Sequence, residues 1–536
     1  MAVVKEEFYL TRWLVLRGIG IIFLCAFWSL SFQVWGLVGS DGILPVSELL
    51  QRAYEHYDLE AFYRFPTLSW LSSSDAALMA ICVIGIILSL LLIAGIATIP
   101  VLLALWLTYL SAVINGQGFM LLQWDVLLLE VGFSAAFFAP FAVWPPFDEQ
   151  PIPPNGGLWI LRIILFKLML LSGVVKLTSG DMAWRNLSAL SYHFHTQPLP
   201  TWLGWYTHYL PSWLLETSVA AVFVIELIVP FMIFMGRNAR QWACLLLAGL
   251  QFAIIFTGNY GFFNWLTIVL CLTLLDDHFY RRFLPEFIQP KWPKTRPISP
   301  ELYWRTTAIW CVAITMFFLN FYKMVPFFLQ GRAIGPTAQK TMDAVRPFIE
   351  PPAVVQRTLD WLRPYRVLNS YGLFAWMTKN RFEIEIQGSN DLKEWKPYVF
   401  KWKPGDLKER PAFIGPHMPR LDWRMWFAAL GDARRNGWVY RVLKRLQEGS
   451  PSVNELFKKN PFPKSPPQYI RAVLYDYRFT TPEEKDKTGR WWRRTMLRMY
   501  TRVFKKEEWK RIRFTQPKKK KKTQDEPEEK TKSKKK

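Results

Sequence analysis

Cysteine and histidine are both scarce in this sequence, with five and six copies among 536 residues. The cysteines all lie inside apolar runs, and none belongs to a Cys-x-x-Cys pair: they are Cys25, Cys82, Cys244, Cys271 and Cys311. This distribution excludes a disulfide framework and a cysteine-based zinc site. It predicts that the thiols are small buried hydrophobes inside helices.

Familiar catalytic and nucleotide-binding motifs are missing as well. The sequence contains no Gly-x-Ser-x-Gly, no P-loop, no Gly-x-Gly-x-x-Gly and no His-Glu-x-x-His. His193 and His195 form one His-x-His pair, but a metal site needs further ligands and none is apparent in the sequence. We therefore expect no metal and no cofactor, and the residues alone name no reaction.

Charged residues make up only 20% of the chain, and they are unevenly placed. Residues 331–536 hold 48 Lys and Arg against 23 Asp and Glu, which leaves 18 against 19 in residues 1–330. The nearly neutral first part, with the chain's heavy use of Trp and Phe, is typical of membrane helices with interfacial aromatic residues. Because such a chain is tethered to a membrane, its basic second part favours anionic lipid headgroups over nucleic acid as a partner.

The apolar runs predict a membrane α-helical bundle of about nine transmembrane helices, because a bilayer core needs about 20 apolar residues per helix. The expected spans lie near residues 13–36, 76–96, 100–116, 121–142, 158–178, 213–235, 241–257, 262–276 and 305–325. The first run is too long for the apolar part of a signal peptide and has no Ala-x-Ala cleavage site, so we interpret it as an anchor.

Basic residues in the short loops set the expected orientation. Arg237 and Arg240 follow the sixth span, and five more basic residues follow the eighth, between residues 281 and 296. Placing both loops in the cytosol places the N-terminus there too. The loops at 37–75, 177–212 and 258–261 then lie on the far side of the membrane, and an odd number of spans carries the soluble domain to that side.

The spacing of polar and apolar residues changes at the start of the soluble domain. Three segments alternate or are rich in aromatic residues, as strands are: 381–387, 395–402 and 469–479. Two segments have helical patterns: 421–430 and 438–446. The sequence therefore predicts a polytopic transmembrane domain at 1–330, a β-rich α+β soluble domain at 331–515 and a disordered lysine-rich tail at 516–536.

Polar residues inside the apolar runs are costly in a membrane and are therefore candidate functional residues. In the fourth span Gln123 and Glu130 share one helix face, while Asp125 points elsewhere. The fifth span carries Arg162, Lys167 and Lys176, and the sixth carries Glu216 and Glu226. Acids and bases on neighbouring helices indicate internal ion pairs, which either fix helix packing or form part of a site.

Three polar segments are expected to meet on the far side of the membrane: the start of the fourth span, residues 176–198 and the turn at 258–264. In that turn Gly258 and Gly261 suit positive φ. His193 and His195 alternate as on a strand, so both could face one ligand. The candidates for a functional surface are Gln123, Trp124, Asp125, Glu130, Lys176, Thr178, Trp184, Tyr192, His193, Thr196, Gln197, Asn259, Tyr260 and Asn264.

These segments, in order along the chain, resemble the lipase maturation factor family. The likeness rests on Gln123-Trp-Asp125 with Glu130, on Ser172–Thr178, on Tyr192-His193 with Thr196-Gln-Pro198, and on Gly258-Asn-Tyr260 with Phe263-Asn264. It continues through Asn369–Phe374, Arg381–Gly388 and Gly415–Trp423.

The resemblance implies a chaperone-like membrane protein that assists the folding and assembly of secreted homodimeric lipases and is not itself an enzyme. Its compartment would be the endoplasmic reticulum membrane in a eukaryote and the inner membrane in a bacterium. Its partners would be a secretory client and membrane lipids, the latter also through the basic tail.

Two alternatives stay open. The membrane half is remotely similar to the group that includes the vitamin K-dependent carboxylase. In an enzyme of that kind Asp125, Glu130, Lys176 and His193 would form the site, with Lys176 paired to one carboxylate or acting as a buried base. The third possibility is a lipid-binding or scaffolding protein that uses its basic tail.

Overall fold

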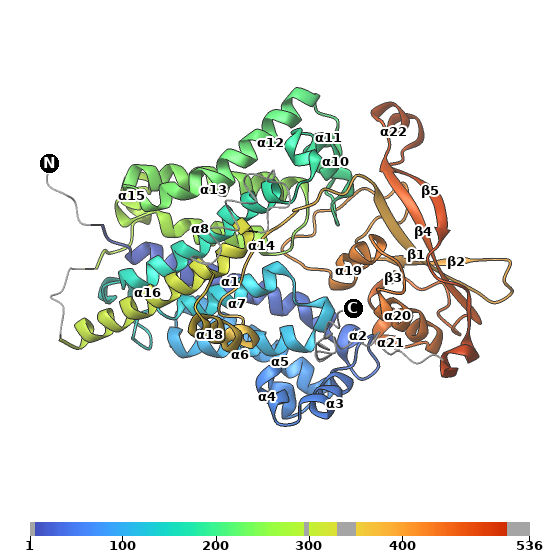
Figure 1. Ribbon diagram of the computed structural model, residues 1–536, viewed down its shortest axis with the longest axis horizontal. Coiled ribbons are helices and arrows are strands. Elements are labelled where there is room, and N and C mark those ends of the chain that lie inside the picture. Colours follow the sequence, from blue (N-terminus) through green and yellow to red (C-terminus); the bar gives the residue numbers. More distant parts are fainter. Residues whose placement is uncertain (1–5, 294–299, 330–349, 512–536) are drawn as a thin grey trace, which may run out of the picture.

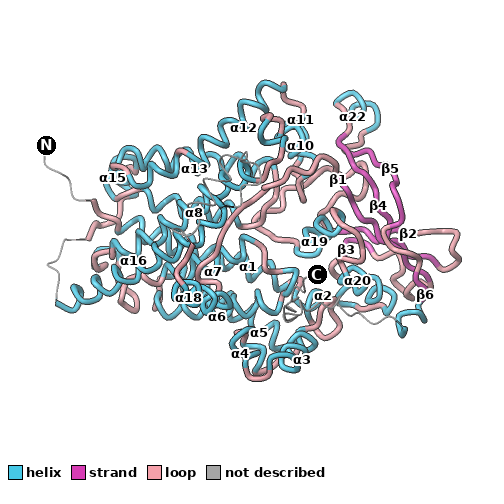
Figure 2. The backbone as a smooth tube through the Cα atoms, in the orientation of Figure 1, coloured by secondary structure: helices cyan, strands magenta, loops and turns pink. Residues whose placement is uncertain are grey.

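The computed structural model describes residues 6–293, 300–329 and 350–511, and it has two parts (Figure 1). A helical bundle occupies one end of the long axis, and a β-sheet with short helices occupies the other. Figure 2 shows the strands, in magenta, gathered in this second part. The predicted tail at 516–536 and the predicted boundary at 330 fall outside the described residues.

Within the described residues, seven helices are long and apolar enough to cross a membrane. They are α1 (Tyr9–Ser31), α5 (Asp75–Ala94), α6 (Thr98–Asn115), α8 (Asn155–Thr178), α12 (Ser212–Leu227) with the 3-10 turns that follow it, α13 (Arg237–Thr257) and α16 (Pro300–Leu329). The chain is a multi-pass membrane protein, as the apolar runs predict.

Two shorter helices, α7 (Gln123–Ala135) and α14 (Phe263–Cys271), occupy the expected fourth and eighth spans. At 1.5 Å per residue the 13 residues of α7 extend about 20 Å, less than the roughly 30 Å of a hydrocarbon core. Every residue of α7 from Trp124 to Gly132 is buried, so this helix is enclosed by protein and need not match the bilayer thickness. The predicted nine spans are therefore seven long helices and two short ones among the described residues.

The two ends of α1 lie at opposite ends of the bundle. The Tyr9 amide at the start of α1 bonds the Asp277 carboxylate at 2.8 Å, whereas Ser29 near the other end of α1 contacts His417 of the sheet domain at 2.9 Å. Each of the loops 37–75, 177–212 and 258–261 hydrogen-bonds the sheet domain. The grouping of these loops on one face, predicted from the sequence, is confirmed.

The sheet is antiparallel with strand order β3-β2-β1-β4-β5, and β6 pairs with β4. The strands are β1 (Arg381–Ser389), β2 (Lys396–Phe400), β3 (Phe457–Lys459), β4 (Tyr469–Phe479), β5 (Trp492–Met499) and β6 (Phe504–Lys505). β1 and β4 form the centre, in register from Arg381 opposite Tyr477 to Ser389 opposite Tyr469.

The helices α19 (Arg420–Ala429) and α20 (Gly437–Glu448) pack against the sheet on the side nearer the bundle (Figure 1). α20 buries Val439, Val442, Leu443 and Leu446, the three-and-four spacing of one helix face. The three predicted strands and both predicted helices are confirmed. β5 was not predicted, because Arg493–Arg498 are exposed on both faces of the strand and buried and exposed positions therefore do not alternate along it.

The cysteine prediction holds in part. Cys82, Cys244 and Cys271 are buried and Cys25 is partly buried, but Cys311 is exposed on α16. An exposed thiol on a membrane-spanning helix faces the hydrocarbon, where a small apolar side chain is equally at home.

The arrangement predicts that Asn186 and the sheet domain share one compartment. Asn186-Leu-Ser188 is a glycosylation sequon, and Asn186 is exposed in the loop after α8. In a eukaryotic host, a glycosylation acceptor inserted beside Asn186 and one inserted after the exposed Gly489 should both be modified, whereas an acceptor at the N-terminus should not. Endoglycosidase-sensitive gel shifts measure this. Modification at only one of the first two sites would contradict the shared face.

Candidate functional site

The start of α7 is where the sheet domain attaches to the bundle. Asp125 is fully buried and accepts two hydrogen bonds from the guanidinium of Arg420 on α19, both 2.7 Å long. Tyr109 of α6 donates a third at 2.6 Å. Because a bidentate pair fixes direction as well as distance, it sets the orientation of α19 relative to α7.

Glu130 holds the segment through which the chain enters the sheet domain. Lys167 of α8 lies 2.5 Å from one carboxylate oxygen, and the Tyr371 hydroxyl donates to the other at 2.5 Å. Gln123 exchanges two hydrogen bonds with the backbone of Gly372, at 2.9 and 3.1 Å. Gln123 and Glu130 thus share a helix face, as their spacing predicts, and both meet residues 369–372.

The segment His195–Pro198 is bound in a similar way by Arg381, the first residue of β1. The Arg381 guanidinium donates to the carbonyls of His195, Gln197 and Pro198 and pairs with Glu383. Together these contacts form the joint between the bundle and the sheet domain, and three more complete it. Trp426 donates to the Thr196 carbonyl, and Asn259 donates to the Ala412 carbonyl. The rings of Trp124 and Trp423 meet edge to face with centroids 4.7 Å apart. Many of the sequence candidates therefore lie where bundle and sheet domain join.

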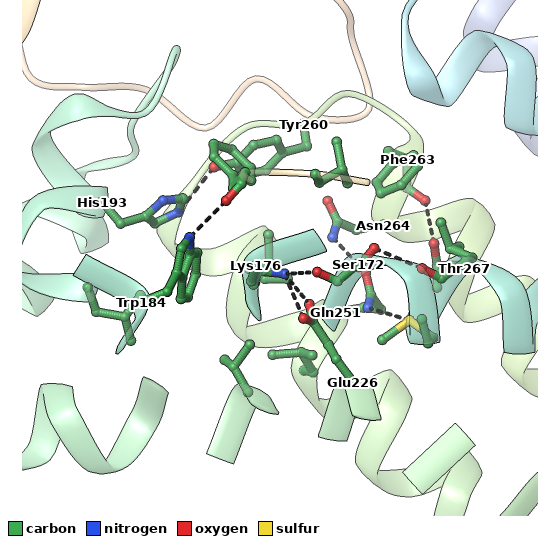
Figure 3. A pocket seen from close by; sticks show the side chains of 18 residues that line it. Ser172, Lys176, Trp184, His193, Glu226, Gln251, Tyr260, Phe263, Asn264 and Thr267 are labelled. Carbon is green, nitrogen blue, oxygen red and sulfur yellow. Dashed lines mark hydrogen bonds and ion pairs between the residues drawn. The ribbon is translucent and has the colours of Figure 1, made fainter. Parts of the chain in front are cut away.

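A cavity of about 110 Å³ lies inside the bundle next to this joint (Figure 3). Its walls come from α8, α12, α13 and α14, together with α9 (Met182–Arg185), α10 (Ala189–Thr196) and the segment containing Leu373 and Phe374. Most of the wall is apolar. The polar side chains that reach it are Ser172, Lys176, Trp184, His193, Glu226, Gln251, Tyr260, Asn264 and Thr267.

The charged element of the cavity is the pair Lys176–Glu226. The Lys176 ammonium lies 2.6 and 2.8 Å from the two carboxylate oxygens, and both side chains are almost fully buried. The Trp184 ring lies 5.3 Å from the ammonium, a cation–π distance.

The expectation that Lys176 pairs with Asp125 or Glu130 is wrong. Lys176 lies nine residues beyond Lys167 on α8, which is a rise of about 14 Å along the helix. Glu130 is already paired with Lys167. The partner comes instead from α12, which lies against α8. Asp125, Glu130 and Lys176 of the enzymatic alternative are thus divided among three separate ion pairs, and only His193 lies in the same cavity as Lys176.

His193 lies at the rim of the cavity, hydrogen-bonded to Tyr260. The Tyr260 hydroxyl donates to the Gln197 side chain at 2.9 Å, so the contact of 3.2 Å to His193 Nε2 is one in which the imidazole donates. Burial, and secondarily the charge of Lys176, lower the pKa of His193 to about 4. The ring is therefore neutral near pH 7.

His193 and His195 do not face one ligand, because α10 is a helix and not the strand that the alternation suggested. Residues two apart on a helix point about 200° from each other. His195 contacts the ring of His208 instead, with centroids 4.9 Å apart. Among the described residues no three His, Cys, Asp or Glu side chains converge as a metal site.

The turn at 258–264 also differs from expectation at one residue. Gly261 has φ of +58°, as predicted, but Gly258 is extended, with φ of −154°. A Cβ at Gly258 would lie 1.9 Å from the Gln197 side-chain oxygen and would displace the amide that accepts from Tyr260.

Five of the candidates line the cavity: Lys176, Trp184, His193, Tyr260 and Asn264. Thr178 only bonds the carbonyl of Val174, and Tyr192 lies outside with Lys379 5.9 Å from its ring. Gln251, which accepts a 2.7 Å hydrogen bond from Asn264, was not among the predicted residues. The only feature of the sequence that pointed to it is that its amide side chain lies inside an apolar span. The cavity offers an ion pair, a neutral imidazole and two amides to a small guest within apolar walls.

Comparison with known proteins gives the family. A model of the lipase maturation factor transmembrane domain matches residues 10–282, and a model of the lipase maturation factor C-terminal domain matches residues 367–502. Lipase maturation factor 2 from Gallus gallus is 34% identical, covering 90% of this chain and 80% of its own length.

Other relatives agree. Lipase maturation factor 2 from Homo sapiens is 34% identical over 90% of this chain and 81% of its own length. Lipase maturation factor 1 from Bos taurus is 30% identical over 92% of this chain and 88% of its own. No solved structure matches the chain. The family resemblance carried by the sequence motifs is confirmed.

Breaking the joint should destabilise the whole protein. Asp125→Asn or Arg420→Met alone leaves a buried charge unpaired, which costs about 3–5 kcal/mol. The double substitution removes both charges and should recover part of that loss, which thermal unfolding in detergent measures. The same cycle on the exposed pair Glu409–Lys458 should cost less than about 1 kcal/mol. Strictly additive losses at Asp125 and Arg420 would contradict the joint.

The pKa of His193 makes stability depend on pH. Because the folded-state pKa of about 4 lies below the ordinary value near 6.5, the unfolded chain takes up the proton first as pH falls. Stability is fully present above pH 6.5 and is lost toward pH 4, by about 2 kcal/mol at pH 5.

His193→Gln should therefore flatten part of the fall in Tm between pH 7 and pH 5. His278→Gln, at an exposed histidine, is the control and should leave the fall unchanged. Equal pH profiles for His193→Gln and the unsubstituted protein would refute this assignment.

Proposed function

The chain belongs to the lipase maturation factor family, and from that premise we propose that it is a membrane-bound maturation factor for secreted lipases. In a eukaryotic cell its compartment is the endoplasmic reticulum membrane. The protein holds a folding lipase on the face that carries the sheet domain until the client has assembled. Nothing in the cavity favours the enzymatic alternative, because Asp125, Glu130 and Lys176 belong to three separate ion pairs.

The exposed edge of β5 is the observation that most directly supports this function. β5 pairs on one side with β4 and is the last strand of the sheet order, so its other side has no strand neighbour in the described chain. Met496 and Leu497 expose 52% and 48% of their surface on it. An open edge of this kind offers backbone hydrogen bonds to an extended segment of another protein.

The client's chemistry fits such an edge. A lipase that has not yet dimerised exposes the apolar surface that dimerisation later buries, and exposed apolar surface invites aggregation. β5 offers apolar side chains and arginines together, so we propose that it pairs with an extended client segment of apolar and acidic residues. The joint at Asp125 and Arg420 keeps this edge at a fixed position relative to the bundle.

Lipid contacts belong to the proposal as well. The lysine-rich tail at 516–536 is proposed to touch anionic headgroups, a contact that salt should weaken. The division of the chain into 1–330, 331–515 and 516–536 remains our proposal for its domains.

Polar substitutions on β5 should reduce lipase maturation without unfolding the factor. Cells lacking their own maturation factors would express a secreted homodimeric lipase with each variant, and secreted lipase activity per unit of factor would be measured. Met496→Lys and Leu497→Lys should each lower it severalfold, and both together should lower it further. Leu430→Lys, at a leucine 42% exposed in the turn after α19, should have no effect.

The cavity provides the opposing test. Lys176→Met combined with Glu226→Gln removes the buried pair without leaving one charge alone. The proposal expects this double variant, once shown to be folded, to retain most maturation. Complete loss in a folded double variant, with the β5 variants active, would overturn the β5 proposal in favour of chemistry at the cavity.

A further inference from the structure

A lateral groove of about 710 Å³ lies at the end of the bundle away from the sheet. α6 contributes Ile99 and Leu103, and α16 contributes Ala308, Ile309 and Val312. Arg305 is the one charged residue of its lining. Leu103 is 40% exposed and the neighbouring Phe141 is 78% exposed, so the groove opens sideways toward the bilayer.

The groove is polar at one end and apolar along its length. Arg305 lies near the start of α16 and donates to the Ala139 carbonyl at 2.8 Å, and α6 begins at the same level, where Thr98 bonds the Pro140 carbonyl. Val312 lies seven residues farther along α16, about 10 Å deeper at 1.5 Å per residue. A cation near the membrane surface with an apolar channel leading inward matches the shape of a phospholipid.

Arg305 has no acidic partner among the described residues. In the part of the chain that the structure describes, Arg305 forms no ion pair, and its guanidinium carbon lies 5.4 Å from the centre of the Phe141 ring. A guanidinium carries five N–H donors, so most of its donors remain available. By contrast, Arg240 at the same end of the bundle pairs with Glu6.

A second arginine adds to this excess of positive charge. Arg12 is 1% exposed and donates to the Gln150 side chain and the Pro151 carbonyl, both at 2.8 Å, and Pro151 lines the groove. Its Nε and Nη1 have no hydrogen-bond partner among the described residues. Arg305 and Arg12 thus place two positive charges beside the groove, which favours an anionic guest there.

We propose that this groove binds one anionic phospholipid of the surrounding bilayer. Its phosphate accepts hydrogen bonds from Arg305, and one acyl chain lies along Ile309 and Val312. The predicted orientation places the groove in the cytosolic leaflet, which is the leaflet rich in anionic lipids. The site is independent of client binding, because it lies at the opposite end of the bundle from β5.

Native mass spectrometry of the purified full-length protein in mild detergent tests this assignment. Phosphatidylserine and phosphatidylcholine with identical acyl chains are added together, and one phosphatidylserine should be retained in preference. Arg305→Gln should lower that preference about fivefold, the share that one arginine near an anionic surface contributes. Arg282→Gln, at an exposed arginine on the same face, should leave it unchanged.

A second pair of variants tests the acyl channel. Ala308→Trp fills the groove from an exposed position and should abolish retention of the lipid, while Ile314→Trp, at a 53% exposed position outside the groove, should not. Equal retention of the two lipids, or unchanged preference in Arg305→Gln, would overturn the proposal. Displacement of the lipid by glycerophosphoserine, which has no acyl chains, would also overturn it by showing a phosphate site without a lipid channel.

Discussion

The buried ion pair between Asp125 and Arg420 is the interaction on which the arrangement of this protein depends. Two charges without water are tolerated only when each satisfies the other, and here Tyr109 and the Leu122 amide also donate to the carboxylate. Because the pair joins a helix enclosed in the bundle to a helix against the sheet, neither part can shift without exposing a charge to an apolar surrounding. The position of β5 relative to the bundle depends on it, whereas the Phe374 wall of the cavity is held by Trp184, whose ring nitrogen donates to the Phe374 carbonyl.

The bundle and the sheet domain are consequently one folding unit in energetic terms. Glu130 needs Lys167 from the bundle and Tyr371 from the segment leading to the sheet, and Arg381 of β1 needs the carbonyls of the loop after α10. Polar groups left buried by one part are satisfied by the other. Whichever part forms first therefore carries unpaired groups until the second docks.

Local patterns of the sequence predicted local structure well, and partners poorly. Apolar runs predicted the membrane helices, alternation predicted β1, and aromatic content predicted β2 and β4, because each of these patterns reflects which residues are buried. The short length of α7 was not visible, since an enclosed helix is as apolar as a spanning one. The partner of Lys176 depends on which helix faces α8, a tertiary fact that spacing does not contain. His193 and His195 show the limit of a two-residue pattern, which a short helix reproduces by chance.

The arginines of β5 have a consequence for the protein's behaviour toward its own copies. Arg493, Arg494 and Arg498 lie on an edge strand whose outer side is open. Arg493 and Arg494 pair with Glu484 and Glu385 of their own chain, and Arg498 donates to a backbone carbonyl. If two molecules diffusing in one membrane met edge to edge, their Arg498 side chains would add like charge to the new strand pair, and like charges facing each other across a sheet are destabilising. An acidic or uncharged segment meets no such repulsion. The strand thus admits a foreign chain while discouraging the runaway self-assembly that an open sheet edge otherwise permits.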